Sequence, residues 1–120
     1  MKVEIIKSGD GKVHEVARLV IENSVYEFEE KRELKVAGCY NKSVKVFYSK
    51  DVDELTEVSY EVIKKLVKKF QISAVLNCEE SIFKQLVKNT NQNIESKISE
   101  ERRLLLYTYF EDKLLIYYDK

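Results

Sequence analysis

Cys78 is the residue whose type and position point most directly to chemistry. It stands in Asn77-Cys78-Glu79-Glu80-Ser81, where a predicted strand runs into a predicted helix. Backbone amides at a helix start lower the pKa of a thiol and favour the reactive thiolate. The carboxylates of Glu79 and Glu80 act in the opposite direction, and His14, the only histidine, is the only candidate base. We therefore rank a thiol enzyme at Cys78 below a structural role for this residue.

The turn Ser8-Gly9-Asp10-Gly11-Lys12 is a candidate anion site between a predicted strand and a predicted helix. Its backbone amides could hold an anion, with the Lys12 ammonium beside it. The turn lacks the longer glycine-rich loop of a Walker A motif, and the Asp10 carboxylate would repel a phosphate. We favour a plain capped turn and keep Gly9, Gly11 and Lys12 as the residues of a weak anion site.

Metal chemistry has little support in the sequence. His14-Glu15-Val16-Ala17-Arg18 is not the zinc-peptidase motif, because Arg18 stands where the second histidine ligand belongs. Carboxylates that could hold a divalent ion in a nuclease are each explained by helix capping or solvation: Glu4, Asp10, Glu15, Asp51 and Asp53. We predict no metal and no cofactor.

Tyrosine and leucine side chains crowd the C-terminal segment. Residues 104–110 and 114–118 alternate as two strands around a turn at Glu111-Asp112, which predicts a β-hairpin. If Phe110 opposes Lys113, one face carries Leu105, Tyr107, Tyr109, Leu114, Ile116 and Tyr118, and the other carries Leu104, Leu106, Phe110, Leu115 and Tyr117. Both faces are apolar, so the hairpin must be covered on both sides by the sheet, by a helix or by another subunit.

The hairpin has two functional interpretations. Aromatic residues with a polar tip are enriched at protein interfaces, and the interface candidates are Leu105, Tyr107, Tyr109, Ile116, Tyr117 and Tyr118. The tyrosines could instead stack nucleic-acid bases beside Arg102 and Arg103. Lysine and arginine balance aspartate and glutamate at 21 each, and this zero net charge disfavours nucleic acid, whose binding relies on a basic excess. Packing in the chain's own core is as well supported as the interface.

The remaining chain predicts the scaffold. Residues 2–7 alternate as a strand, and residues from about 12 to about 31 carry apolar side chains at helical steps. Residues 34–38 and 44–48 alternate as a hairpin around a turn at Tyr40-Asn41-Lys42. A helix follows over residues 51–70, with Asp51 and Glu54 as a capping box and lysines near its end. Residues 72–76 form a short apolar strand, and a third helix capped by Asn77 ends near residue 89.

This order predicts an α+β fold with a ferredoxin-like βαββαβ core, an added third helix and a C-terminal β-hairpin. The alternative is a three-layer α/β sandwich with the strand at residues 72–76 in its centre. The length of 120 residues is that of a single domain, which we assign to residues 1–120.

The bulk composition favours a cytoplasmic protein. No apolar run approaches the ~20 residues that cross a bilayer, and the N-terminus lacks the plan of a signal peptide. Two cysteines, Cys39 and Cys78, are too few for a disulfide framework. The abundance of lysine and glutamate leans towards a thermophilic source.

We therefore expect a small non-catalytic interaction module, a homodimer that associates through the Tyr/Leu-rich hairpin or a binder of a protein partner. The alternative is a nucleic-acid-binding or metal-dependent nucleic-acid-processing protein.

Overall fold

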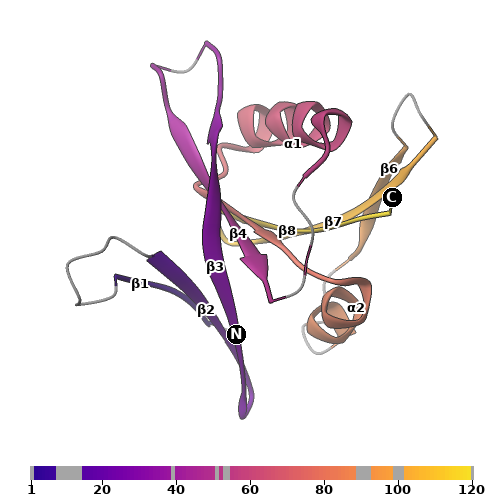
Figure 1. The fold of residues 1–120 in the computed structure, drawn as a ribbon. Coiled ribbons are helices and arrows are strands. Elements are labelled where there is room, and N and C mark those ends of the chain that lie inside the picture. The colour runs from indigo at the N-terminus through magenta and orange to yellow at the C-terminus, as the bar shows by residue number, and fades with distance from the viewer. Residues whose placement is uncertain are drawn as a thin grey trace.

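One mixed β-sheet with a helix against each face organises the computed structural model, which describes residues 2–7, 15–38, 40–50, 52, 55–88, 93–98 and 102–119 (Figure 1). Its elements, in chain order, are β1 (Lys2–Lys7), β2 (Glu15–Ile21), β3 (Ser24–Lys35), β4 (Ser43–Ser49), α1 (Glu57–Phe70), β5 (Ala74–Asn77), α2 (Glu80–Lys88), β6 (Glu95–Ile98), β7 (Leu104–Phe110) and β8 (Lys113–Tyr118). Neither helix, at 14 and 9 residues, is long enough to cross a membrane.

The eight strands lie in the order β1-β2-β3-β4-β5-β8-β7-β6. β1 to β4 form an antiparallel meander, and β8, β7 and β6 form a second one. The two meanders are joined by parallel pairing of β4 with β5 and of β5 with β8. A parallel pair requires a crossover connection, and α1 supplies the one between β4 and β5.

The ferredoxin-like prediction is wrong. That plan places both helices on one face of a four-stranded antiparallel sheet, whereas here α1 and α2 pack against opposite faces of an eight-stranded mixed sheet. The described chain also has two helices and not three, because residues 15–31, predicted as most of the first helix, belong to the β2–β3 hairpin.

The wrong helix prediction for residues 15–31 has a physical cause. Val16, Ala17 and Val20 satisfy a helical spacing, but in β2 every second residue from Glu15 to Ile21 is buried, which is the period of a strand. β-branched side chains favour this extended form. The turn to β3 uses Glu22 in the left-handed region, with φ of 53°, which an ordinary residue rarely adopts. The turn between β2 and β3 contains no glycine or proline that would have predicted it from the sequence.

A β-bulge in β3 changes the face that its side chains occupy. The pairing with β4 shifts between Glu30, which opposes Phe47, and Arg32, which opposes Val46. Residues on the N-terminal side of the bulge, such as Phe28, therefore face α2, and residues beyond it, such as Leu34, face α1. Lys31 is the extra residue that makes this change possible.

Two separate apolar cores follow from this arrangement. α1 covers a core that includes Val46, Ile63, Val75, Leu114 and Ile116. α2 covers a core on the opposite face that includes Phe28, Phe47, Leu76, Phe83 and Leu115. β4, β5 and β8 supply side chains to both cores, so the centre of the sheet is buried on both sides, as expected of parallel strands.

The helix boundaries differ from those predicted. α1 begins at Glu57, where the Thr56 hydroxyl oxygen accepts a hydrogen bond from the Ser59 amide at 3.3 Å; the predicted caps Asp51 and Glu54 lie outside the described residues. The end of α1 is confirmed, since Gln71 is its C-cap in the left-handed conformation. Asn77, predicted to cap the last helix, is instead the final residue of β5.

Both predicted hairpins are confirmed. β3 and β4 pair with Leu34 opposite Val44. β7 and β8 pair with Phe110 opposite Lys113, the register under which the two faces were predicted. The predicted faces also hold, because Leu105 and Ile116 lie in the α1 core and Leu115 lies in the α2 core. The apolar hairpin is thus covered on both sides by the chain itself.

Candidate functional site

Cys78 lies at the end of β5 and is buried against β8. Its amide donates to the Ile116 carbonyl oxygen at 3.1 Å, and its thiol donates to the same oxygen at 3.3 Å. Burial raises the pKa of the Cys78 thiol far above its ordinary value, and the charge of Glu79 raises it further. These features support a structural thiol and not a nucleophile.

The predicted interface residues of the hairpin lie mostly inside the chain. Leu105 and Ile116 are fully buried, and Tyr107 and Tyr118 are each 8% exposed. Tyr109 and Tyr117 are half-buried. The Tyr109 ring lies tilted against Phe70 of α1, with 4.5 Å between the ring centroids, and meets Tyr107 edge-on at 5.7 Å. Rings packed in this way are not available to stack on nucleic-acid bases.

The predicted anion site lies outside the described residues, with Gly9, Gly11, Lys12 and His14 all in the segment between β1 and β2. Of the acidic residues considered for a divalent ion, Asp10, Asp51 and Asp53 also lie outside them.

The two remaining acids do not converge. Glu4 opposes Arg18 on one face of the sheet, whereas Glu15 lies on the other face with Ala17. Across the described ranges, no three His, Cys, Asp or Glu side chains are close enough to hold a metal ion.

A charge cluster that the sequence did not predict lies on the α2 face of the first meander. Lys45 of β4 forms ion pairs with Glu15 of β2 and, at 3.6 Å, with Glu30 of β3. Glu15 is buried, and Glu30 is brought onto this face by its place before the bulge. The hydrogen bond from Lys45 to Glu15 is the main cause that raises the pKa of Lys45. The cluster neutralises a buried carboxylate and holds three strands together.

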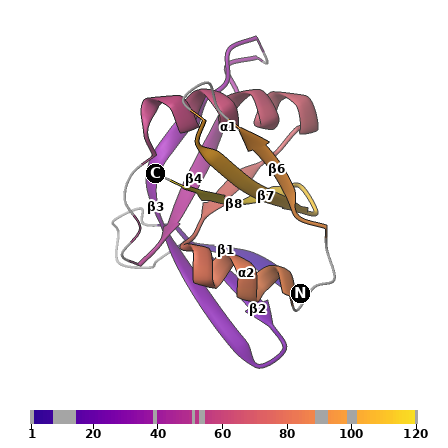
Figure 2. The ribbon, with the colours of Figure 1, turned by 90° about the vertical axis from the view of Figure 1, so that its right-hand side faces the viewer.

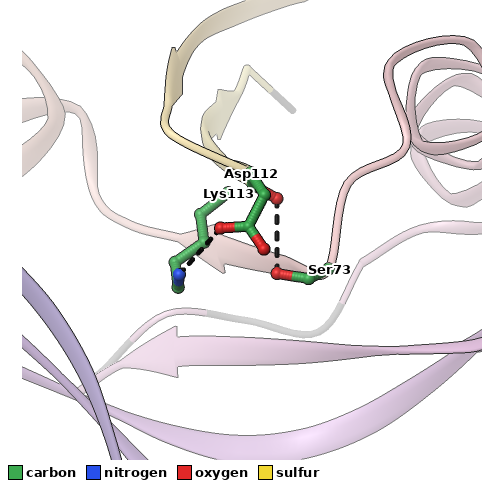
Figure 3. Close-up of polar contacts among 3 residues, drawn as sticks. All are labelled: Ser73, Asp112 and Lys113. Atoms are coloured by element: carbon green, nitrogen blue, oxygen red, sulfur yellow. Dashed lines mark hydrogen bonds and ion pairs between the residues drawn. The ribbon is translucent and has the colours of Figure 1, made fainter.

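A second polar cluster fastens the β7–β8 turn to the start of β5 (Figure 3). The Ser73 amide and hydroxyl both donate to the Asp112 carbonyl oxygen, at 2.7 Å and 3.4 Å, and Lys113 pairs with the Asp112 carboxylate at 2.9 Å. Hydrogen bonding from Ser73 and then from Lys113 lowers the pKa of Asp112. Ser73 and Lys113 both bond Asp112, so they hold the turn in place and do not form a catalytic pair.

A hollow of about 490 Å³ lies on the α1 face beside the middle of β3 and the end of β4. The carboxylates of Glu27 and Glu29 and the ammonium groups of Lys31 and Lys50 line it. The buried Ser49 hydroxyl, also in this lining, has no hydrogen-bond partner. Because charges of both signs are interspersed, the hollow does not define one class of ligand.

The β6 edge is the described surface with the strongest features of a binding site. Figure 2 looks at this end of the sheet, where β6 lies between α1 and α2. Every residue of β6 is exposed, and within the described chain this strand pairs only with β7. Ile98 is 68% exposed and Ile94, just before the strand, is 45% exposed. An edge strand presents unpaired backbone amides and carbonyls, which is a template for another strand.

The residues of β6 alternate between the two faces. Glu95 opposes Tyr107 and Lys97 opposes Leu105, so both charged side chains lie on the α1 face. Ser96 and Ile98 oppose Leu106 and Leu104 on the α2 face. Burial raises the pKa of Tyr107, and a hydrogen bond with Glu95 raises it further. The edge thus presents an ionic face and an apolar face. This edge has only a weak signal in the sequence, since residues 94–103 mix apolar and charged side chains without a clear pattern.

The chain matches no protein-family model, and no match emerges among curated proteins or solved structures.

Proposed function

We propose that the protein is a non-catalytic interaction module that self-associates at the β6 end of its sheet. The observation that carries the proposal is the open β6 edge, which is exposed along its whole length and carries the exposed side chains of Ile98 and, just before the strand, Ile94. Exposed aliphatic residues beside unpaired strand amides are the combination used in strand-addition interfaces.

The state of the reactive groups supports the non-catalytic part of the proposal. Cys78 is buried with its thiol engaged by Ile116. The acids Glu15 and Glu30 are both paired with Lys45. An active site requires a nucleophile or base that a substrate can reach, and these groups are instead committed to holding strands together.

The location of the interface differs from the one predicted for the hairpin. Leu105, Tyr107, Ile116 and Tyr118 are used within the chain, where they pack under α1. The hairpin supports the interface indirectly, because β7 is the strand on which β6 is held.

The test is the mass of the protein in solution, measured by sedimentation velocity at concentrations up to about 1 mM. We expect a monomer–dimer equilibrium in the wild type and its loss in Ile98→Asp. Val25→Asp is the matched control, since Val25 is a 54% exposed aliphatic residue at the β2–β3 turn, far along the sheet order from β6. A wild type that stays monomeric throughout, or an Ile98→Asp variant that dimerises as the wild type does, would refute the proposal.

A further inference from the structure

We propose that β6 pairs antiparallel with β6 of a second copy about a twofold axis, in the register that places Ser96 of one copy directly opposite Ser96 of the other. We call this register an axis at Ser96. The inference rests on the proposed function, for which it names the partner and the register. Two sheets would then join into one continuous sheet, with the α1 helices of both copies on the same side.

Symmetry restricts the possible registers. Residues directly opposed in an antiparallel pair share a face of the sheet. In a twofold pairing of identical strands, one residue must therefore oppose its own copy across the axis. A register centred between two neighbouring residues would oppose side chains of different faces. The central candidates in β6 are Glu95, Ser96 and Lys97.

The charges distinguish these three registers. An axis at Glu95 would place the two Glu95 carboxylates opposite each other, and an axis at Lys97 would do the same with two ammonium groups. Like charges directly opposed are destabilising. An axis at Ser96 instead opposes Glu95 of each copy to Lys97 of the other, which forms two ion pairs on the α1 face.

The apolar residues agree with the same register. Counting outward from Ser96, Ile94 of each copy opposes Ile98 of the other. These are the two exposed large aliphatic side chains at this end of the described chain, at 45% and 68%. By the period of two, both lie on the α2 face with Ser96. The segment Ile94-Glu95-Ser96-Lys97-Ile98 is therefore complementary to its own antiparallel copy at every position.

The other edge of the sheet has this property only in part. β1 reads Lys2-Val3-Glu4-Ile5-Ile6-Lys7. An axis at Glu4 opposes two carboxylates, and an axis at Ile5 opposes Glu4 to Ile6 and Val3 to Lys7. An axis at Val3 opposes Lys2 to Glu4, but these two side chains already form an ion pair with each other within β1, at 2.6 Å. A charged residue on an edge strand ordinarily prevents pairing. In β6, Lys97 of one copy opposes Glu95 of the other, so the charged residues of this edge favour pairing with a second copy in this register.

The expected dimer is weak. Five opposed residues on each side make a contact below the ~1,200 Å² of a standard stable interface. Ion pairs between exposed side chains contribute little to affinity, so the aliphatic pairs and backbone hydrogen bonds must supply most of it. Dissociation on dilution is therefore part of the expected behaviour.

Disulfide cross-linking tests the register directly. Directly opposed residues have Cα atoms about 4.5–5.5 Å apart, within the ~4.4–6.8 Å that a disulfide spans, whereas diagonal neighbours are about 7–8 Å apart. In a Cys39→Ser background under a glutathione redox buffer, we expect Ser96→Cys to form a covalent dimer. Glu95→Cys and Lys97→Cys should each form no covalent dimer alone and should cross-link when mixed.

Charge reversal provides a second test that introduces no cysteine. Glu95→Lys should lose self-association, because two pairs of lysines then oppose each other, and the double variant Glu95→Lys/Lys97→Glu should restore it. Unchanged dimerisation of Glu95→Lys would overturn the register. So would a dimer that Ile98→Asp disrupts but Ser96→Cys does not cross-link, and in both cases the proposed function would stand. A monomeric wild type would refute both the proposed function and the β6 register. Larger open-ended assemblies would indicate that β6 pairs with β1 of the next copy, and would overturn the twofold pairing of β6 with β6.

Discussion

Cys78 and Ile116 are joined twice through one atom, since the amide and the thiol of Cys78 both donate to the Ile116 carbonyl oxygen. The pair connects the end of β5 to β8 at the point where the chain leaves the sheet for α2. A carbonyl oxygen has two lone pairs and can accept both bonds. The thiol therefore acts as a core donor at a strand junction.

The first prediction concerns the reactivity of Cys78. Because burial raises the pKa of the thiol and thiolate is the reactive form, we expect Cys78 in a Cys39→Ser variant to resist iodoacetamide in the native state. Labelling should proceed only through unfolding, so its rate should rise with denaturant in parallel with the unfolded fraction. Rapid labelling of the folded protein at neutral pH would contradict this account and favour a reactive thiol.

The second prediction concerns the buried hydroxyl of Tyr48. This oxygen accepts a hydrogen bond from the Leu55 amide at 3.3 Å in the buried approach to α1. Tyr48→Phe leaves that amide without this acceptor, so we expect the free energy of unfolding to fall by about 1–3 kcal/mol, the usual cost of a buried unsatisfied group. Urea denaturation followed by far-ultraviolet circular dichroism measures the loss.

Tyr60→Phe is the matched control for Tyr48→Phe. The Tyr60 hydroxyl accepts a hydrogen bond from the Lys35 amide at 3.2 Å, but in an exposed setting. Water can replace the lost partner, so the expected cost is below about 1 kcal/mol. Equal losses in the two variants would show that burial does not govern the Tyr48 bond.

The third prediction concerns Asp112 and pH. The folded-state pKa of Asp112 lies below its ordinary value of 3.8 because of hydrogen bonding from Ser73 and the neighbouring Lys113. A carboxyl group with a lowered pKa stabilises the fold above its unfolded-state pKa, and this contribution is lost as pH falls through the folded-state pKa. Asp112→Asn should therefore lower stability at pH 7, by less than about 1 kcal/mol because the carboxylate is half exposed.

The pH series distinguishes this effect from a general loss of packing. The difference between wild type and Asp112→Asn should stay constant from neutral pH down to the ordinary value of 3.8 and disappear below it. Asp119→Asn, which removes an exposed carboxylate at the end of β8, is the control. It should change the free energy of unfolding little, both at neutral pH and in acid. A difference for Asp112→Asn that persists in acid would assign the effect to packing.

The C-terminal hairpin was predictable because its information is local. Alternation on both sides of Glu111-Asp112 predicted two strands around a turn, and the register assumed for their faces, with Phe110 opposite Lys113, is the one in the structure. The two apolar faces then required cover on both sides, and α1 and α2 provide it. Pattern and turn together were sufficient.

The first half of the chain was less predictable because its pattern is ambiguous. Val16 and Val20 fit a helical face and equally fit the unburied side of β2. The left-handed Glu22 has no sequence signal of the kind that glycine gives. The parallel pairing of β4, β5 and β8 joins segments far apart in the chain, and no local pattern encodes it.

The candidate site was missed for a related reason. β6 is four residues long and exposed throughout, so it lacks the alternation of burial that identifies a strand. Its role depends on being the last strand of the sheet, which is a property of topology. The Glu15, Glu30 and Lys45 cluster was equally hidden, since three strands and a bulge bring it together.

Because of its bulge, β3 supplies side chains to the apolar cores on both faces of the sheet. Phe28 and Leu34 are an even number of residues apart and would share a face in a regular strand, yet they serve the α2 and α1 cores respectively. The chain's tolerance of length changes in β3 should therefore follow parity. Removal of Lys31 alone would leave a regular strand in which Phe28 and Leu34, then five residues apart, keep their opposite faces and their partners in β4. Removal of two residues would leave them four apart, and without a new bulge one of them would turn to the wrong side of the sheet. A single deletion at the bulge should therefore be less damaging than a double one.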